Sequence, residues 1–345
     1  MAFTTIDDPT AHFQNLSWTG DGSSTRALTN TGNANLQPDF VWLKNRTDAE
    51  NHTLADTSRG VTNRLMSNNT NAQDNSGLVS VQSDGFTVQQ SNNGNTNAKQ
   101  YVAYQWKANG GTTASNSSGT ITSTVQANTA AGFSIISYTG NGSDGATIGH
   151  GLNATPEVFF PKCTNTSTNW EMYYFPKGGT RQYGYLNLTT AFQTWSHNAP
   201  SSTIISLSGS GDSNGNGRPM IGYAFHSVKG FSKIGTFPGN GLTNGPFVYT
   251  GFKPALLFIK RSAGGTGTWL IWNNASDPRN TASQALKANT NDAQNVGYWN
   301  IDLLSNGFKP KATDAELNGS GNDLFYMAFA ESPFVSSAGV PTTAR

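Results

Sequence analysis

The sequence is poor in cysteine and in charged residues, and each shortage excludes a class of protein. Cys163 is the only cysteine in 345 residues, so no disulfide can form within the chain. A chain without disulfides is consistent with folding in a reducing cytoplasm. Asp, Glu, Lys and Arg together make up 12% of the residues, about half the usual share, and the net charge is +1. Because the chain is nearly neutral and has no basic run, we expect no nucleic-acid partner.

Long apolar runs are also missing from the sequence. No stretch of about 18 apolar residues occurs, which excludes a transmembrane helix, so we expect no membrane partner. The opening sequence MAFTTIDDPTAHFQ has neither the basic start nor the apolar stretch of a secretory signal. We therefore expect a protein that is assembled in the cytoplasm of the cell that makes it.

Residue patterns that carry catalysis are missing as well. The five histidines never form the H-E-x-x-H spacing that places two imidazoles on one helical face. The G-x-S-x-G turn of serine hydrolases and the G-x-x-x-x-G-K-[ST] phosphate loop do not occur. We therefore expect no enzyme, no catalytic residue and no cofactor. Glycan hydrolysis stays open as an alternative, because folding can bring any two carboxylates together.

One segment is similar to half of a calcium-binding loop. Residues 212–217, DSNGNG, place oxygen-bearing side chains at alternate positions and a glycine at the sixth position. The twelfth position of such a loop supplies a bidentate carboxylate, but here it is Tyr223. We expect an Asn/Gly turn and no metal site, with a Ca²⁺ ion near Asp212 as the alternative.

The abundant residues favour β-structure. Gly occupies 38 positions, and Asn, Thr and Ser fill most segments between short apolar runs. Gly and Asn adopt positive φ readily, which suits strands joined by tight turns. Aromatic residues make up 11% and include eight Trp, whereas disordered chains are poor in aromatics. The sequence predicts an all-β fold, with residues 281–291 as a short helix or an ordered loop.

A pattern of turns and apolar strands occurs three times along the chain. Each copy opens with a glycine turn, at residues 18–22, 138–142 and 237–241. An apolar strand that follows a proline and ends in Lys comes next, at residues 39–44, 157–162 and 255–260. A second apolar strand closes each copy, at residues 101–106, 220–225 and 326–330.

The three copies predict three tandem modules, each a jelly-roll or lectin-like antiparallel β-sandwich. We place the modules at residues 1–107, 108–228 and 229–345, each about the size of one sandwich domain. Within the second module, residues 109–131 form a Gly/Ser/Thr-rich linker, whose second half alternates apolar and polar residues as a strand does. One element, residues 69–73, matches residues 289–294 in the third copy, but its counterpart in the middle copy is hard to find.

Two tryptophans are candidates for contact with a glycan. Trp42 and Trp106 lie in the repeated strands and are expected in the core, where aromatic side chains bury the most area. Trp195 and Trp299 lie in polar surroundings, so we expect them to be exposed, where an indole ring can stack on a sugar. Core packing is the alternative for both residues.

Several motifs in the middle and at the end of the chain are shared with a known family. They are WKANGGTT at residues 106–113, GTITSTVQANTAAGFSI at 119–135, YTG at 138–140, GHGL at 149–152, GFSKIG at 230–235 and MAFAESPF at 327–334. Together they resemble the repeat modules of structural and tail-fibre-like virion proteins of marine tailed bacteriophages, including phages of cyanobacteria. The resemblance covers roughly residues 100–335.

The resemblance implies a non-enzymatic structural protein on the surface of a phage virion, with lectin-type jelly rolls as its modules. Its expected partners are other virion proteins of the capsid or the tail, further copies of this chain in a homotrimer, and a glycan of the host surface. The sequence lacks the heptads of a fibre shaft, which favours a capsid decoration, a knob or the distal part of an appendage. The alternatives are a free-standing carbohydrate-binding protein and, after it, a glycan-degrading enzyme.

The two ends of the chain are candidates for attachment to a neighbouring subunit. Residues 1–13 and 336–345 are short segments outside the repeated strands. Such tails can order on docking, for example by adding a strand to the edge of a partner's sheet. Phe3, Ile6 and Phe13 are the apolar residues that we expect to serve as the tether.

Overall fold

The fold consists almost entirely of β-strands. The computed structural model describes residues 3–342, and within them strands β1 to β25 are accompanied by the 3-10 helix η1 (Pro9–Ala11) and the helix α1 (Ala315–Asn318). The expected all-β fold is therefore confirmed. In the described part of the chain no helix is long and apolar enough to cross a membrane.

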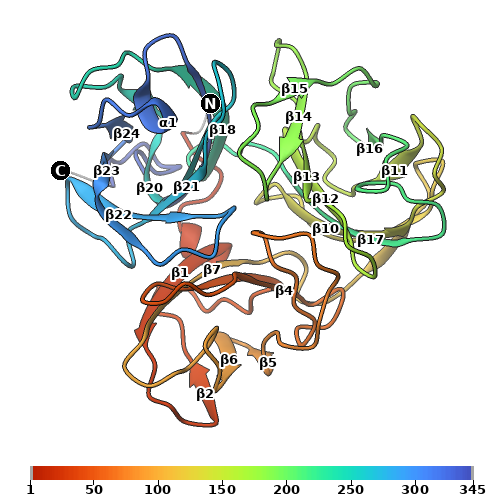
Figure 1. Cartoon of the computed structure of the whole chain (residues 1–345), viewed down its shortest axis with the longest axis horizontal. Coiled ribbons are helices and arrows are strands. Elements are labelled where there is room, and N and C mark those ends of the chain that lie inside the picture. The colour runs from red at the N-terminus through yellow and green to blue at the C-terminus, as the bar shows by residue number, and fades with distance from the viewer. Residues whose placement is uncertain (1–2, 343–345) are drawn as a thin grey trace.

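The strands form three lobes that surround a common centre (Figure 1). Lobe 1 runs from β1 (Phe13–Thr19) to β7 (Gln100–Trp106) and lobe 2 from β8 (Ala114–Asn116) to β17 (Pro219–Phe225). Lobe 3 runs from β18 (Ser232–Pro238) to β25 (Asp323–Pro333). Each lobe touches the other two, so the lobes close a ring.

The remaining strands fall within these three lobes. Lobe 1 also contains β2 (Thr25–Leu28), β3 (Phe40–Asn45), β4 (Thr53–Asp56), β5 (Ser80–Gln82) and β6 (Gly85–Gln89). Lobe 2 also contains β9 (Ser123–Asn128), β10 (Phe133–Thr139), β11 (Thr147–Gly149), β12 (Val158–Cys163), β13 (Glu171–Tyr174), β14 (Gln182–Tyr185), β15 (Gln193–Thr194) and β16 (Ile204–Ser206). Lobe 3 also contains β19 (Val248–Tyr249), β20 (Phe252–Arg261), β21 (Trp269–Asn273), β22 (Ala282–Lys287), β23 (Asn295–Leu304) and β24 (Gly307–Pro310).

Every lobe contains the same four antiparallel strands in the same order. The order is β1-β7-β3-β4 in lobe 1, β10-β17-β12-β13 in lobe 2 and β18-β25-β20-β21 in lobe 3. We call these four strands the central sheet of each lobe. The repeated sequence segments are therefore repeated strands: the segments that follow a proline become β3, β12 and β20, and the closing segments become β7, β17 and β25. Smaller antiparallel pairings, such as β2-β6-β5 and β11-β16, accompany the central sheets.

Each central sheet buries both of its faces. In β3, Trp42 belongs to a core that all three lobes share, whereas Val41 and Leu43 belong to a core within lobe 1. Phe160 of β12 and Phe258 of β20 take the place of Trp42 in the shared core. Successive side chains of a strand point to opposite faces, so a continuous apolar run produces a strand that is covered on both sides.

Three aromatic rings meet at the centre of the shared core. Trp106, Phe225 and Phe329 occupy equivalent positions in the closing strands β7, β17 and β25. Their ring centroids are 6.1, 5.4 and 5.7 Å apart, and all three pairs pack edge to face. Edge-to-face packing is a favoured arrangement of aromatic pairs. The predicted core position of Trp106 is confirmed, and the lobes are held around an apolar centre.

Two local predictions are settled by the strand assignments. The alternating stretch in the second half of the expected linker forms part of β9, which extends the central sheet of lobe 2. The expected short helix or loop at residues 281–291 is wrong over residues 282–287, which form β22. Helix-forming residues such as Ala285 and Leu286 are buried in the core there, and tertiary packing overrides their local propensity.

Candidate functional site

A lysine at the end of each repeated apolar strand crosses into the preceding lobe of the ring. Lys44, Lys162 and Lys260 are completely buried, although each carries an ammonium group. Each Nζ donates a hydrogen bond to a main-chain carbonyl oxygen of the preceding lobe. These acceptors are Thr70 for Lys162 at 3.0 Å, Thr189 for Lys260 at 2.9 Å and Asn291 for Lys44 at 3.2 Å.

A ring nitrogen beside each lysine makes a second bond across the same junction. Trp269 pairs with Lys260 in its hairpin, and Trp170 and His52 occupy the equivalent positions in the other two lobes. All three rings are completely buried. The bonds run from Trp170 Nε1 to the carbonyl of Met66 (2.7 Å), from Trp269 Nε1 to that of Tyr185 (2.9 Å) and from His52 Nε2 to that of Lys287 (2.9 Å).

A main-chain bond in the opposite direction completes each junction. The amides of Gln73, Phe192 and Gln294 donate to carbonyl oxygens of the next lobe. Their acceptors are Thr164 at 2.8 Å, Ser262 at 2.9 Å and Arg46 at 2.9 Å, respectively. We call the lysine, the ring nitrogen and this amide the latch of a junction, since the same set occurs three times.

The latches locate the middle copy's counterpart of residues 69–73 and 289–294, which is hard to find in the sequence. Residues 186–192 make the same contacts as residues 67–73 and 288–294, although the three segments share only an asparagine and an alanine at the same positions. The shared asparagine has a function in the fold. Its Oδ1 accepts the main-chain N–H of the ring residue, as in Asn187 to Trp170 at 2.9 Å and Asn289 to Trp269 at 2.9 Å.

The electrostatics of the three lysines are unusual for a structural role. Burial lowers the pKa of Lys44, Lys162 and Lys260 to about 8 in each case. Lysines with a lowered pKa often act as nucleophiles or bases. Here each Nζ is enclosed and bonded to carbonyl oxygens, so no substrate can reach it. The lysines therefore join lobes and do not form a reactive centre.

His52 gives the junction between lobes 3 and 1 a titratable group. Its Nδ1 accepts a hydrogen bond from Trp42 Nε1 at 2.8 Å, which assigns the proton to Nε2 and the donor role toward Lys287. Burial, with a contribution from the charge of Lys44, lowers the pKa of His52 to about 3. A second proton on Nδ1 would face the indole N–H of Trp42, so His52 is neutral near pH 7.

The glycine turns that open the copies are held by a second repeated device. A buried asparagine accepts the main-chain N–H of the residue between the two turn glycines and donates to its side chain, as Asn214 does with Asn141 at 2.9 and 3.1 Å. Asn95 and Asn318 make the same pair of bonds with Asp21 and Asn240. We call this arrangement the asparagine clasp. Sequence reasoning missed it, because the three asparagines lie far along the chain from their turns.

The segment that is similar to a calcium loop contains one of these clasps. Asn214, at the third loop position, uses both atoms of its amide on Asn141 and on the carbonyl of Ser143. Asp212 accepts the main-chain N–H of Asn169 at 2.8 Å. Among residues 3–342 no group of three or more His, Cys, Asp or Glu side chains is placed to hold a metal ion. The segment is a turn in which the side chains of Asp212 and Asn214 have partners within the protein.

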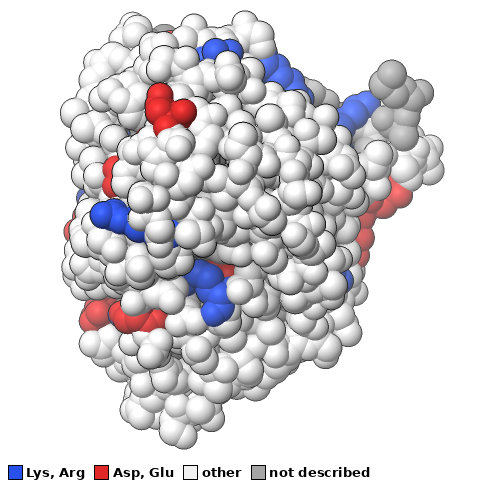
Figure 2. All heavy atoms as spheres, turned by 90° about the vertical axis from the view of Figure 1, so that its right-hand side faces the viewer, with Lys and Arg blue, Asp and Glu red and all other residues white. Residues whose placement is uncertain are grey.

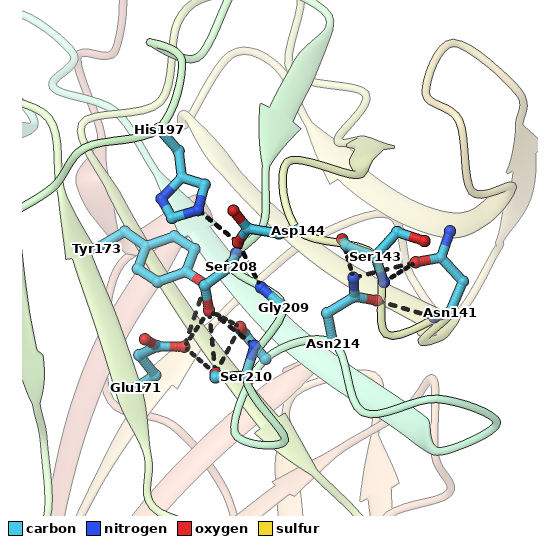
Figure 3. Close-up of polar contacts among 11 residues, drawn as sticks. Asn141, Ser143, Asp144, Glu171, Tyr173, His197, Ser208, Gly209, Ser210 and Asn214 are labelled. Carbon is cyan, nitrogen blue, oxygen red and sulfur yellow. Dashed lines mark hydrogen bonds and ion pairs between the residues drawn. The ribbon is translucent and has the colours of Figure 1, made fainter.

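A polar network lies next to this turn in lobe 2 (Figure 3). The carboxylate of Glu171 is buried and lies within 3.1 to 3.4 Å of the hydroxyls of Tyr173, Ser208 and Ser210. Burial raises the pKa of Glu171. His197, with its Nε2 2.6 Å from Asp144, lies on the other side of Tyr173. The network connects β13 to loops of the same lobe, and Glu171 is not open to a substrate.

The two tryptophans expected to be exposed are buried, and that expectation is wrong. Trp195 is 4% exposed and packs against the ring of Tyr173 at a centroid distance of 4.1 Å. Trp299 is 6% exposed, and its Nε1 donates to Asp314 at 3.1 Å. Polar neighbours in the sequence do not reveal burial when loops fold over a ring. Neither indole offers a free face to a sugar.

The apolar residues of the expected N-terminal tether differ in how far they are buried. Ile6 and Phe13 are 5% and 2% exposed and belong to the shared core, so they are not free to bind a neighbour. Phe3 is 53% exposed and lies near the ammonium group of Lys229. The ends of the expected tethers, residues 1–2 and 343–345, lie outside the described residues.

A groove on the described surface runs between lobes 2 and 3 and has a volume of about 570 Å³. Lobe 2 contributes Glu157, Tyr174 and Lys177, and lobe 3 contributes most of β18. Tyr249, which is 54% exposed, forms part of its rim. Lys233 Nζ donates to the carbonyl of Tyr249 at 2.8 Å and lies over the ring of that residue. The groove combines cations, hydroxyls and an exposed aromatic ring.

Charged side chains are sparse on the surface. Figure 2 shows one face of the molecule, where a few isolated charges interrupt an otherwise uncharged surface. This distribution agrees with the 12% content of charged residues. Uncharged residues therefore make up most of what the protein presents to solvent on this face.

Comparison with known proteins identifies a family. A family model described as a domain of unknown function, DUF7483, matches residues 8–333, which include all three lobes. No curated protein and no solved structure matches the chain.

Proposed function

We propose that this chain, which belongs to the DUF7483 family, is a non-enzymatic structural protein on the surface of a tailed-bacteriophage virion. In this role it is a capsid decoration, a knob or a component of a tail fibre. It is assembled in the cytoplasm of the bacterial host and carries no cofactor. The resemblance of residues 100–335 to phage virion modules suggested this function, and the architecture supports it.

The observation that carries the proposal is the ring of lobes joined by three equivalent latches. Opening one junction breaks a lysine bond, a ring-nitrogen bond and a main-chain bond, and exposes the shared aromatic core. The lobes therefore support one another, and a closed arrangement of this kind resists local opening. Such resistance suits a protein that must keep its shape on a particle outside the cell, where no chaperone refolds it.

The proposal treats the three lobes as tandem β-sandwich modules of the jelly-roll kind, at residues 1–107, 108–228 and 229–345. The repeated strand order and the repeated latches support a common origin for the modules. One chain then carries three similar lobes around one axis. A monomer can sit on a local threefold axis of a particle, and a homotrimer is the arrangement for a fibre tip.

Purified virions of the phage that encodes this chain provide the test. Negative-stain images with an antibody against the chain should show label at regular positions on the capsid or on the tail. Mass spectrometry of the same particles should find the chain at a fixed copy number. Absence of the chain from purified particles would overturn the proposal.

A carbohydrate-binding protein is the second candidate function. The observation that favours it is the groove between lobes 2 and 3, which is lined by the exposed ring of Tyr249 and by Thr236. In the proposed virion protein, this site would contact a glycan of the host surface. A glycan array discriminates the two, because sugar binding by a protein that is absent from virions favours the second function.

A further inference from the structure

The three junctions have equivalent outer grooves. Each groove runs along the outer edge of the first strand of a central sheet: β10 at the junction of lobes 1 and 2, β18 at that of lobes 2 and 3, and β1 at that of lobes 3 and 1. The preceding lobe supplies the opposite wall. The latches are equivalent at the three junctions, so the three grooves lie at equivalent positions. Their contents can therefore be compared directly.

A strand of the chain itself fills the groove between lobes 1 and 2. β9 pairs with β10 over six residues, from Ser123 opposite Tyr138 to Asn128 opposite Phe133. Gln126 of β9 is completely buried, and its Nε2 donates to the hydroxyls of Thr57 and Ser58 in lobe 1, at 2.9 and 3.0 Å. A groove of this kind therefore accepts an extended strand that bonds to both of its walls.

Side chains close most of the groove between lobes 3 and 1. Asn15 Nδ2 donates to the carbonyl of Ala255 at 2.9 Å, and Ser17 Oγ donates to that of Ala275 at 2.7 Å. Both donors project from the edge of β1 to the wall of lobe 3. The cavity that remains has a volume of about 230 Å³. The edge of β1 is therefore bonded to lobe 3 by side chains at these two positions.

The groove between lobes 2 and 3 is not filled by a described strand, and side chains bridge only part of it. β18 is the last strand of its sheet, so no described strand pairs with its outer edge. Val228 exchanges main-chain bonds with Ser232, and Ser227 Oγ accepts the N–H of Ile234, so the start of the edge is occupied. Beyond Ile234 the edge faces the 570 Å³ groove. Thr236 there takes the place of Ser137, which pairs with Thr124 of β9.

We propose that this groove binds an extended, acidic segment of a partner polypeptide, which adds to β18 as an antiparallel strand where β9 adds to β10. Strand addition to an exposed sheet edge is an established mode of peptide recognition. The charge of the groove selects the acidic segment, since Lys177, Lys229 and Lys233 line it against the one carboxylate of Glu157. The inference concerns this edge alone and does not depend on the proposed location in a virion.

A peptide that copies the chain's own β9 is the probe. Its sequence is that of residues 120–125, TITSTV, of which residues 123–125 pair with β10 beyond the position equivalent to Ile234. Thr124, which would lie opposite Thr236, is replaced by Glu in one version and by Lys in the other. We expect the Glu peptide to bind the whole protein with a Kd in the micromolar to millimolar range, at least threefold more tightly than the Lys peptide. Hydrogen exchange at the Thr236 amide should slow when the Glu peptide is bound.

Two variants of the protein locate the binding. Thr236→Pro removes the outward N–H at an edge position, where proline is tolerated, and should weaken the Glu peptide about tenfold. Lys177→Glu, at a side chain that is 76% exposed, should weaken it about threefold, whereas Lys107→Glu, which makes the same charge change outside the groove, should not. The lysine variants keep the test valid if the proline variant does not fold.

Three results would overturn the proposal. One is a failure of both peptides to bind at millimolar concentration, and another is binding that Thr236→Pro and Lys177→Glu leave unchanged. The third is a shift of the Thr236 amide by an oligosaccharide and not by the peptides, which would make the groove a glycan site. Presence or absence of the chain in virions bears on the proposed function and not on this result.

Discussion

The junction between lobes 1 and 2 and the junction between lobes 2 and 3 have the same inner contacts but different outer contacts. Both contain a buried lysine, a buried indole N–H donor and a main-chain bond in the reverse direction. On the outside, β9 fills one groove and the other groove is open. The comparison teaches that the inner contacts hold the ring together, whereas the outer strand edges are free to acquire different partners.

The third junction, between lobes 3 and 1, differs from the other two in its inner contacts. His52 replaces the tryptophan of the other two junctions and keeps the bond to a carbonyl of the preceding lobe. The ring is smaller, and it adds a titratable group that depends on Trp42 for its tautomer. We therefore expect acid to weaken this junction more than the other two.

The largest effect is expected from removal of a latch tryptophan. Trp170→Ala deletes a completely buried indole from the shared core and should lower the free energy of unfolding by about 4 kcal/mol. Trp170→Phe keeps most of the packing and leaves the carbonyl of Met66 without its donor, with an expected loss of about 2 kcal/mol. Urea denaturation measures both. Losses below about 1 kcal/mol would show that the latch does not hold the junction.

The next effect is the acid sensitivity of the junction that contains His52. The folded-state pKa of about 3 lies below the ordinary value of 6.5, so the unfolded chain binds the proton first as the pH falls. Stability from this group is complete above pH 6.5 and is lost as the pH falls from 6.5 toward 3, by about 3 kcal/mol at pH 4. Denaturation at a series of pH values measures the slope.

His52→Gln supplies the control for this slope, because it removes the titrating ring and leaves the carboxylates unchanged. Burial also lowers the pKa of His150, to about 4, and that contribution remains in the variant. The difference between the two pH profiles therefore isolates His52. Identical slopes for the two proteins would contradict the assignment of a neutral, buried His52.

A smaller effect is expected from the asparagine clasps. Asn214→Ala removes three hydrogen bonds that its side chain makes to Asn141 and Ser143, and should lower the free energy of unfolding by about 2 kcal/mol. Asn95→Ala in lobe 1 should give a similar loss, since it holds Asp21 by the same bonds. Thermal or urea denaturation of the two variants tests the equivalence. A loss in only one of them would separate the two turns.

The smallest effect belongs to the outer edge. Lys177→Glu should change the free energy of unfolding by less than about 0.5 kcal/mol, because the side chain is 76% exposed and its ion pair with Glu157 spans 3.6 Å. The same variant is expected to weaken the acidic peptide. A large loss of stability would mean that this wall of the groove belongs to the inner framework of the ring.

The sequence predicts where the strands of the repeats lie, but it does not predict which segments of different lobes contact one another. The three apolar segments that end in Lys44, Lys162 and Lys260 are visible as repeats, since continuous apolar runs between turn residues are typical of buried strands. Nothing in the spacing shows that each lysine reaches into another lobe. That contact depends on how the central sheets pack, and packing brings together segments that are about a hundred residues apart, as with Lys162 and Thr70.

The candidate site was the harder part to predict. Trp195 and Trp299 lie between polar residues in the sequence, but loop burial depends on tertiary contacts such as the stacking of Trp195 on Tyr173. Ile6 lies between Thr5 and Asp7 in the sequence and nevertheless reaches the shared core. The sequence does not show that the outer edge of β18 is open, because whether a strand pairs with this edge depends on how the whole chain folds.

The central claim is that the three lobes form one interlocked ring. Native-state hydrogen exchange in increasing urea tests this claim most directly, with main-chain amides of β7, β17 and β25 as reporters of the three lobes. We predict that the slowest amides of all three strands exchange with one common opening free energy, equal to that of global unfolding. Amides of one lobe that open at a clearly lower free energy, while those of the other two stay protected, would contradict it.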